Sequence, residues 1–179
     1  SDAGISYEEV SCNPDHPNVL AKMGSDDGFS VILNGHVDVV PAGDRSQWDY
    51  DPFGGEITDK RILGRGASDM KAGVAGLLFA MKVLKDSGAD LKGNIRLHIV
   101  SDEESGSEYG TTWLCEQGYA EGANAAIIAE PTTNWTIESG QKGNLHIVFK
   151  SIGKSAHGSL GNYKGDNAIL KLNKVLANI

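Results

Sequence analysis

The stretch Phe29-Ser30-Val31-Ile32-Leu33-Asn34-Gly35-His36-Val37-Asp38 joins an apolar, β-branched run to a polar end. Such a run, bounded by glycine and polar residues, is typical of a buried strand. Residues two apart in a strand face the same way, so His36 and Asp38 are expected to point together from its carboxyl end. Open α/β sheets bind their ligands at that end. Alone, the pair suits equally a metal ligand with its carboxylate partner and an ordinary strand-end histidine beside a solvated acid.

Neighbouring segments extend this strand into an α/β fold. Residues 95–100 and 123–129 are apolar runs that read as further strands. Residues 70–87 carry apolar side chains at helical spacing, and Gly88 follows where a C-terminal cap belongs. A second helix is predicted at residues 109–117. This alternation predicts a mixed, mostly parallel sheet with helices on both faces.

The chain changes character after residue 130. Strands are predicted at residues 136–138 and 145–151, followed by a helix over residues 165–179. This tail has no room for a core of its own. We therefore expect a catalytic, metal-binding domain in residues 1–142 and the incomplete start of a second, α+β domain in residues 143–179. Before the long helix, residues 56–59 and 61–63 read as a small hairpin.

The net charge, the cysteines and the apolar stretches exclude several classes of protein. The formal net charge of −8 makes a nucleic-acid phosphate backbone an unfavourable partner, and it fits a carboxylate cluster that binds divalent cations. The two cysteines, Cys12 and Cys115, lie far apart without a CxxC spacing, which fits a reducing cytoplasm. The longest apolar stretch, residues 72–81, is too short to span a bilayer. The first residues show no basic segment followed by an apolar core, so we expect no signal peptide.

The stretch Ser101-Asp102-Glu103-Glu104 directly follows the most hydrophobic predicted strand and holds three consecutive acids. They would repel one another unless a cation compensated their charge. Adjacent side chains diverge at a strand-to-turn junction, so one glutamate can bind a metal while the other reaches a metal-bound water. A solvated acidic loop is the alternative reading, and the buried strand before the acids makes it less favourable.

Two more acids stand at element ends. Asp69 sits at the start of the long helix, where it is either an N-cap or a ligand. Glu130 ends an apolar strand directly before Pro131, and we favour a ligand over a turn acid. Taken in order with His36 and the acid run, these residues predict most of a two-metal hydrolase site.

The assembled motifs resemble the M20 family of metallopeptidases and amidohydrolases. The likeness is closest to the acetylornithine deacetylase and succinyl-diaminopimelate desuccinylase branch, and it rests on Asn34-Gly35-His36-Val37-Asp38-Val39-Val40-Pro41, Gly64-Arg65-Gly66-Ala67-Ser68-Asp69-Met70-Lys71-Ala72-Gly73 and Glu130-Pro131-Thr132. It implies a zinc-peptidase-like catalytic domain followed by a lid, or dimerisation, domain. It also implies homodimers that form through the lid.

The resemblance assigns metal ligands. His36 and Glu130 would bind the first ion, Asp69 would bridge both ions, and Glu104 would bind the second. Zinc is the expected ion, and cobalt or manganese could substitute for it. The family's closing histidine for the second ion has no counterpart after residue 157, so we expect the chain as given to be inactive, or nearly so.

The resemblance also assigns residues to the reaction. Glu103 would be the general base and acid, and Asp38 would orient His36. The Asp69–Met70 peptide bond would be cis. Gly153-Lys154-Ser155-Ala156-His157-Gly158 is similar to the start of the family's lid, where His157 would polarise the substrate carbonyl in the partner subunit.

The implied function is hydrolysis of the amide bond of an N-acyl amino acid, of the deacetylase or desuccinylase type, by a water that two metals activate. A dipeptidase or carboxypeptidase of the same family, acting on short peptides, is one alternative. A catalytically silent metal-binding fragment is the other. We expect a cytoplasmic protein with a small-molecule substrate and with neither nucleic acid nor membrane as a partner.

Overall fold

The computed structural model describes residues 3–132, 134, 136–143, 145–160 and 164–179. The chain divides into two compact units, Ser1–Ile137 and Glu138–Ile179, each considered by itself. The predicted domain boundary at residue 142 stays a prediction. None of the helices in the described ranges is both long and apolar enough to cross a membrane.

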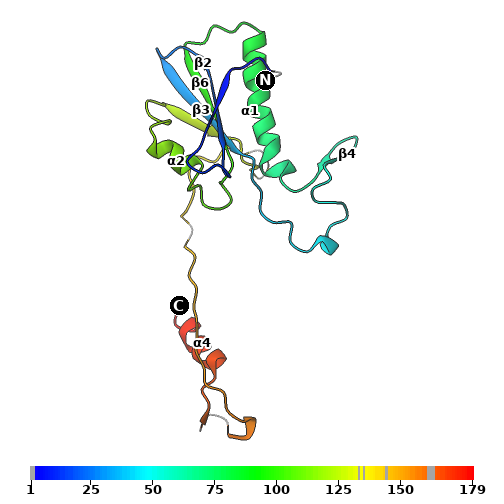
Figure 1. The fold of residues 1–179 in the computed structure, drawn as a ribbon, viewed down its shortest axis with the longest axis vertical. Coiled ribbons are helices and arrows are strands. Elements are labelled where there is room, and N and C mark those ends of the chain that lie inside the picture. Colours follow the sequence, from blue (N-terminus) through cyan, green and yellow to red (C-terminus); the bar gives the residue numbers. More distant parts are fainter. Residues whose placement is uncertain (1–2, 133, 135, 144, 161–163) are drawn as a thin grey trace. The chain divides into compact units, whose positions relative to one another are not determined.

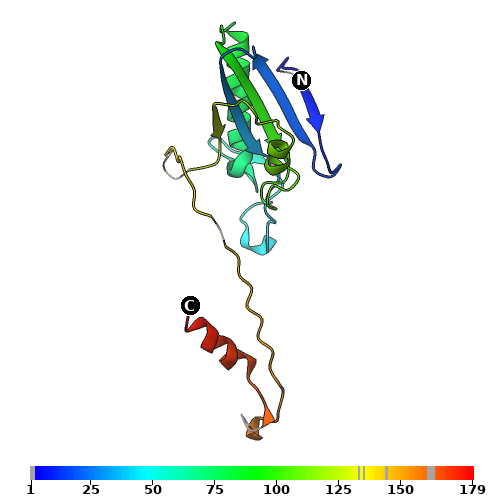
Figure 2. The same ribbon diagram turned by 90° about the vertical axis from the view of Figure 1, so that its left-hand side faces the viewer.

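A five-stranded sheet forms the centre of the first unit (Figures 1 and 2). Its strands lie in the order β1 (Tyr7–Val10), β2 (Asn18–Gly24), β6 (Gly93–Val100), β3 (Phe29–His36) and β7 (Ala125–Ile128). Strand β3 runs parallel to β6 and to β7, whereas β2 is antiparallel to both β6 and β1. The predicted α/β class is confirmed, and β6, β3 and β7 are its parallel part.

Helices cover both faces of the sheet. The long helix α1 (Ala72–Asp86) packs on one face, where β3 and β6 alternate their apolar residues toward it. The hydrophobic core between α1 and the sheet consists of the buried residues Ile5, Leu33, Leu77, Met81 and Leu97. The short helix α2 (Thr111–Glu116) packs its Leu114 against Leu20 and Val100 on the other face. Because Val100 is the last residue of β6, α2 covers only the carboxyl end of that face.

The connection from β3 to α1 is long. It contains the short helix η1 (Arg45–Gln47), the antiparallel pair β4 (Glu56–Ile57) and β5 (Ile62–Leu63), and the π-helical turn η2 (Ala67–Lys71). The predicted hairpin is thus confirmed. The backbone leaves helical geometry at Asp69, and the Asp69–Met70 peptide bond is cis, as expected. The regular helix begins at Ala72, two residues later than predicted.

Strands β1 and β2 were not predicted. Buried and half-buried positions alternate only over residues 18–21, and the polar residues Asn18 and Lys22 bound a short apolar run, so the sequence of β2 carries only a weak strand signal. Strand β1 is short and largely exposed at the sheet edge, so its sequence carries no comparable signal.

Two strand predictions are wrong, one across the boundary between the two units and one within the second unit. Residues 136–138 and 145–151 are not strands, although their apolar composition favours that state. A strand forms only where a neighbour accepts its backbone hydrogen bonds. In the described part of this unit, strand-type pairing is limited to an isolated bridge between Lys154 and Asp166. The predicted helix is present as α4 (Ala168–Leu176), which Asn167 caps at its N-terminus.

Two glycines of α1 provide a matched test of how closely this helix approaches β7. A Cβ atom at Gly73 would lie 2.0 Å from the backbone oxygen of Ala129, the residue before Glu130, whereas one at Gly76 would meet nothing within 4 Å. We expect Gly73→Ala to destabilise the fold by about 1–3 kcal/mol through overpacking. Gly76→Ala should stabilise it by about 0.5–1 kcal/mol. Urea unfolding of both variants measures the difference, and equal midpoints would contradict the close approach.

Candidate metal centre

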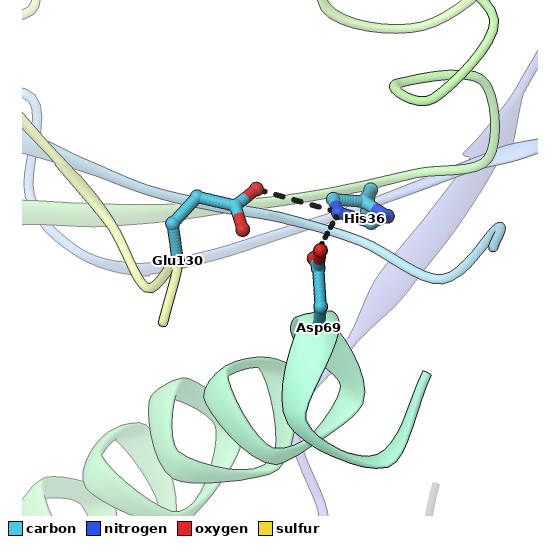
Figure 3. A group of neighbouring side chains, drawn as sticks. All are labelled: His36, Asp69 and Glu130. Carbon is cyan, nitrogen blue, oxygen red and sulfur yellow. Dashed lines mark hydrogen bonds and ion pairs between the residues drawn. The ribbon is translucent and has the colours of Figure 1, made fainter. Parts of the chain in front are cut away.

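The predicted site residues of the first unit come from the carboxyl ends of parallel strands and from the turn before α1. His36 is the last residue of β3, Asp69 lies in η2, Glu103 follows β6, and Glu130 follows β7. Figure 3 shows the carboxylates of Asp69 and Glu130 converging on the ring of His36 from two sides. The topology therefore brings together residues that are far apart in the sequence.

His36 is the buried centre of this group. Its side chain is 1 % exposed, and its Nε2 atom lies 3.2 Å from Asp69 Oδ1 and 3.3 Å from Glu130 Oε1. Its Nδ1 atom donates to the backbone carbonyl of Asp38 at 3.0 Å. When the ring is neutral, this bond leaves the Nε2 lone pair directed at the carboxylates. One donor atom each from His36, Asp69 and Glu130 lies within 4.8 Å of the others, a spacing that can hold a metal ion.

Asp38 joins the histidine to the acidic turn. Its Oδ1 atom lies 3.4 Å from His36 Nδ1, and its carboxylate accepts the backbone N–H groups of Glu103 (3.2 Å) and Glu104 (3.0 Å). The contact with His36 was predicted, but the contact with the turn was not. Asp38 and Glu103 lie 65 positions apart, so no local sequence pattern signals this contact.

The three consecutive acids have different environments. Asp102 is 2 % exposed and accepts the backbone N–H of Tyr109 at 2.8 Å, so it closes the turn. Glu103 is 48 % exposed, and its Oε2 atom lies 3.8 Å from His36 Nε2. Glu104 is half-buried and lies outside the three-residue group that can hold an ion. Its role as a second-metal ligand stays a prediction.

His157 belongs to the second unit. It is exposed, and its Nδ1 atom contacts the hydroxyl of Ser159 at 2.7 Å. Its predicted role toward a substrate carbonyl stays a prediction.

Burial and neighbouring charges together raise the pKa values of three members of the centre. Burial raises the pKa of Glu130 to about 7, helped by the negative charges of Asp69 and Glu103 and opposed by His36. Burial likewise raises the pKa of Glu103, again against the effect of His36. Burial by itself would lower the pKa of His36, but the Asp38 carbonyl and the nearby carboxylates outweigh it and raise that pKa. The metal-free centre therefore retains protons toward neutral pH.

Metal binding is expected to release these protons. All three pKa values are raised, and that of Glu130 reaches about 7, so the metal-free fold holds a proton on Glu130 that it loses as the pH rises through about 7. A cation needs the deprotonated forms, so zinc should displace roughly one to two protons at pH 6 and fewer at pH 8. Calorimetry in two buffers of different ionisation enthalpy measures this number.

The control for proton release is the Glu130→Gln variant. It removes the carboxyl group whose pKa is raised to about 7, so zinc binding to this variant should release fewer protons at pH 6. Burial also shifts the pKa of His98, lowering it to about 4, but His98 lies within β6, outside this group, and should titrate alike with and without metal. Proton release that does not change between pH 6 and pH 8 would contradict the prediction.

The chain is similar in sequence to proteins that are named for removing an acyl group. The chain is 39% identical over 168 residues to the "Probable succinyl-diaminopimelate desuccinylase" of Staphylococcus epidermidis, covering 92% of this chain and 40% of that protein. It is 36% identical over 191 residues to the N-formyl-4-amino-5-aminomethyl-2-methylpyrimidine deformylase of Bacillus subtilis, covering 100% of this chain and 44% of that protein. The chain thus spans about two fifths of the length of these relatives.

Solved structures share the fold. The M20 family metallo-carboxypeptidase Sso-CP2 of Sulfolobus solfataricus superposes with a TM-score of 0.61 at 30% sequence identity. That match covers 70% of this chain and 28% of the carboxypeptidase. Residues 32–161, which include all the predicted site residues, match the family described as Peptidase family M20/M25/M40. The chain therefore belongs to the M20/M25/M40 peptidase family.

Proposed function

We propose that this protein, in a form as long as its relatives, is a metal-dependent hydrolase that cleaves the amide bond of small N-acyl amino acids. The observation that carries the proposal is the convergence of Asp69 and Glu130 on the Nε2 atom of His36. Membership of a peptidase family supports a hydrolytic reaction.

The donor set fits a catalytic metal ion. One imidazole nitrogen and two carboxylates are ligands that zinc accepts, and three protein ligands leave a coordination position for water or substrate. Cobalt and manganese accept the same donors. The hydrogen bond from His36 to the Asp38 carbonyl fixes the ring orientation, as second-layer partners of metal-binding histidines do. We assign the first ion to His36, Asp69 and Glu130.

Glu103 is the proposed proton carrier. A metal ion, when bound, supplies a Lewis acid that acidifies water and polarises the amide carbonyl. Glu103 lies beside the ligand group, and its raised pKa brings it closer to neutral pH, where proton transfer in both directions is efficient. It would take the proton of the attacking water and return it to the leaving amine nitrogen. Asp38 would hold Glu103 in place through the backbone N–H of that residue.

We also propose a second metal ion, which Asp69 and Glu104 would hold. The side chain of Asp69 is 54 % exposed, so its carboxylate is accessible to such an ion. The backbone N–H of Glu104 donates to the carboxylate of Asp38, and this bond fixes the backbone of Glu104 in the turn beside His36. We further propose that the active form is a homodimer in which His157 polarises the substrate carbonyl of the partner subunit.

The names of the relatives favour an N-acyl substrate. The desuccinylase and the deformylase, at 36–39% identity, are both named for removing an acyl group. A carboxypeptidase or dipeptidase activity is the second candidate, because the carboxypeptidase Sso-CP2 and the human carnosine dipeptidase 1 are each 30% identical in sequence. The higher identity leads us to place amide hydrolysis of N-acyl compounds first.

The proposal is tested by assaying N-succinyl, N-acetyl and N-formyl amino acids beside dipeptides, with the chain extended to the length of its relatives. We expect hydrolysis of the N-acyl compounds, its loss after chelation, and its recovery when zinc or cobalt is restored. Faster cleavage of dipeptides would transfer the proposal to the peptidase candidate. Failure of every substrate in the metal-loaded protein would leave a catalytically silent metal-binding module.

A further inference from the structure

The second unit has a charge opposite to that of the whole chain. Between residues 138 and 179 the sequence holds six lysines and two acids, Glu138 and Asp166, a formal charge of +4, although the whole chain carries −8. Of the two acids, Asp166 is already paired with Lys171 at 2.6 Å. The unit therefore attracts anions, in contrast to the cation-binding unit before it.

Two of these lysines line a concavity of about 560 Å³. It is lined by Lys154, Ser155, Ala156, His157, Leu160, Lys164 and Gly165. None of these described lining residues is acidic. Within the described ranges, neither Lys154 nor Lys164 forms a side-chain salt bridge, in contrast to Lys171. The polar side chains of the lining are thus two cations, a hydroxyl and an imidazole.

The imidazole of His157 adds a directed donor. The backbone N–H of Ser159 donates to His157 Nδ1 at 3.3 Å, and the Ser159 hydroxyl lies 2.7 Å from the same atom. Because Nδ1 is the acceptor, the neutral ring carries its proton on Nε2. His157 therefore offers an N–H donor beside the two lysines.

We propose that this concavity is a binding site for a small oxyanion, a carboxylate or a phosphate, held chiefly by Lys154 and Lys164. Charge-assisted hydrogen bonds from ammonium groups to such oxygens are the strongest that these side chains can make. His157 contributes an N–H donor and Ser155 a hydroxyl. The assignment does not depend on the proposed hydrolase reaction, because it needs neither the metal centre nor a partner subunit.

The test is a titration of the 179-residue chain at low ionic strength with succinate, with inorganic phosphate, and with succinamide as the uncharged match of succinate. Binding is followed by calorimetry and by the NMR signals of the His157 ring. We expect succinate or phosphate to bind and succinamide not to bind. The double variant Lys154→Gln, Lys164→Gln should weaken the anion by more than about tenfold, because it removes both charge-assisted donors.

The matched control is Lys174→Gln, which removes a lysine of α4 outside the lining and should change the affinity by less than about twofold, by screened long-range charge only. Tighter binding of phosphate than of succinate would support the site and identify phosphate as the preferred source of the oxyanion. Binding of neither anion would overturn the proposal. So would binding that survives the double variant or that Lys174→Gln weakens equally.

Discussion

Replacing Glu103 with glutamine is expected to lower kcat by about 10²- to 10⁴-fold, the usual contribution of a general base. Glutamine keeps the size of the side chain but cannot accept the proton of the attacking water. Metal binding should persist, because Glu103 lies outside the group formed by His36, Asp69 and Glu130. The measurement is the initial rate on an N-acyl amino acid, with metal content by elemental analysis, in the chain extended to the length of its relatives.

Glu108→Gln is the matched control for this variant. Glu108 is an exposed acid that follows the same turn and has no contact with the ligand group in the described structure. Its replacement removes the same charge and should leave kcat unchanged. Turnover that survives Glu103→Gln would exclude Glu103 as the base. Loss of metal together with turnover would instead make Glu103 a ligand.

The substitution Asp69→Asn should weaken zinc binding by more than about 100-fold. Removal of a residue that only supports a ligand costs about 10- to 100-fold, and a direct ligand should cost more. The fold should be preserved, because the Asp69 side chain is 54 % exposed. Competition with a chromophoric chelator measures the affinity, and the thermal unfolding of the metal-free protein verifies the fold.

Two further variants separate the loss of a ligand from the loss of a negative charge. Asp59→Asn removes an exposed carboxylate between β4 and β5 and should leave zinc affinity unchanged. Glu104→Gln should leave the first ion in place and weaken only a second one. Equal losses for Asp69→Asn and Asp59→Asn would mean that net charge, rather than coordination, determines the affinity.

The sequence predicted the central strands and the site residues for one physical reason. A parallel strand buried on both faces is a short apolar run, and the polar residue that ends it must lie at the sheet edge. His36 stands at such an end. Glu130 follows β7, an apolar strand that is exposed at the edge of the sheet and not buried as predicted, and the structure still brings the two residues together. Asp69 was predicted from its place before the long helix, although the intervening turn η2 is more irregular than a capped helix start.

The failures have a common cause, which is that local pattern does not report long-range partners. Residues 145–151 have the composition of a strand, but the described part of the second unit offers no neighbouring strand to them. Asp102 looks like its neighbours in the acid run, yet its carboxylate is used by the Tyr109 N–H, seven residues away. The second contact of Asp38, with the turn at Glu103, spans 65 positions and has no local signature.

The wide sequence separation of His36, Asp69 and Glu130 has a consequence for folding. These residues meet only when β3, η2 and β7 are assembled, so the unfolded chain offers no equivalent site. An ion held by all three would act as a reversible cross-link that stabilises the assembled sheet by mass action. At a free ion concentration 100 times the dissociation constant, this linkage contributes about 2.7 kcal/mol. The availability of metal would then determine the stability of the fold as well as its chemistry.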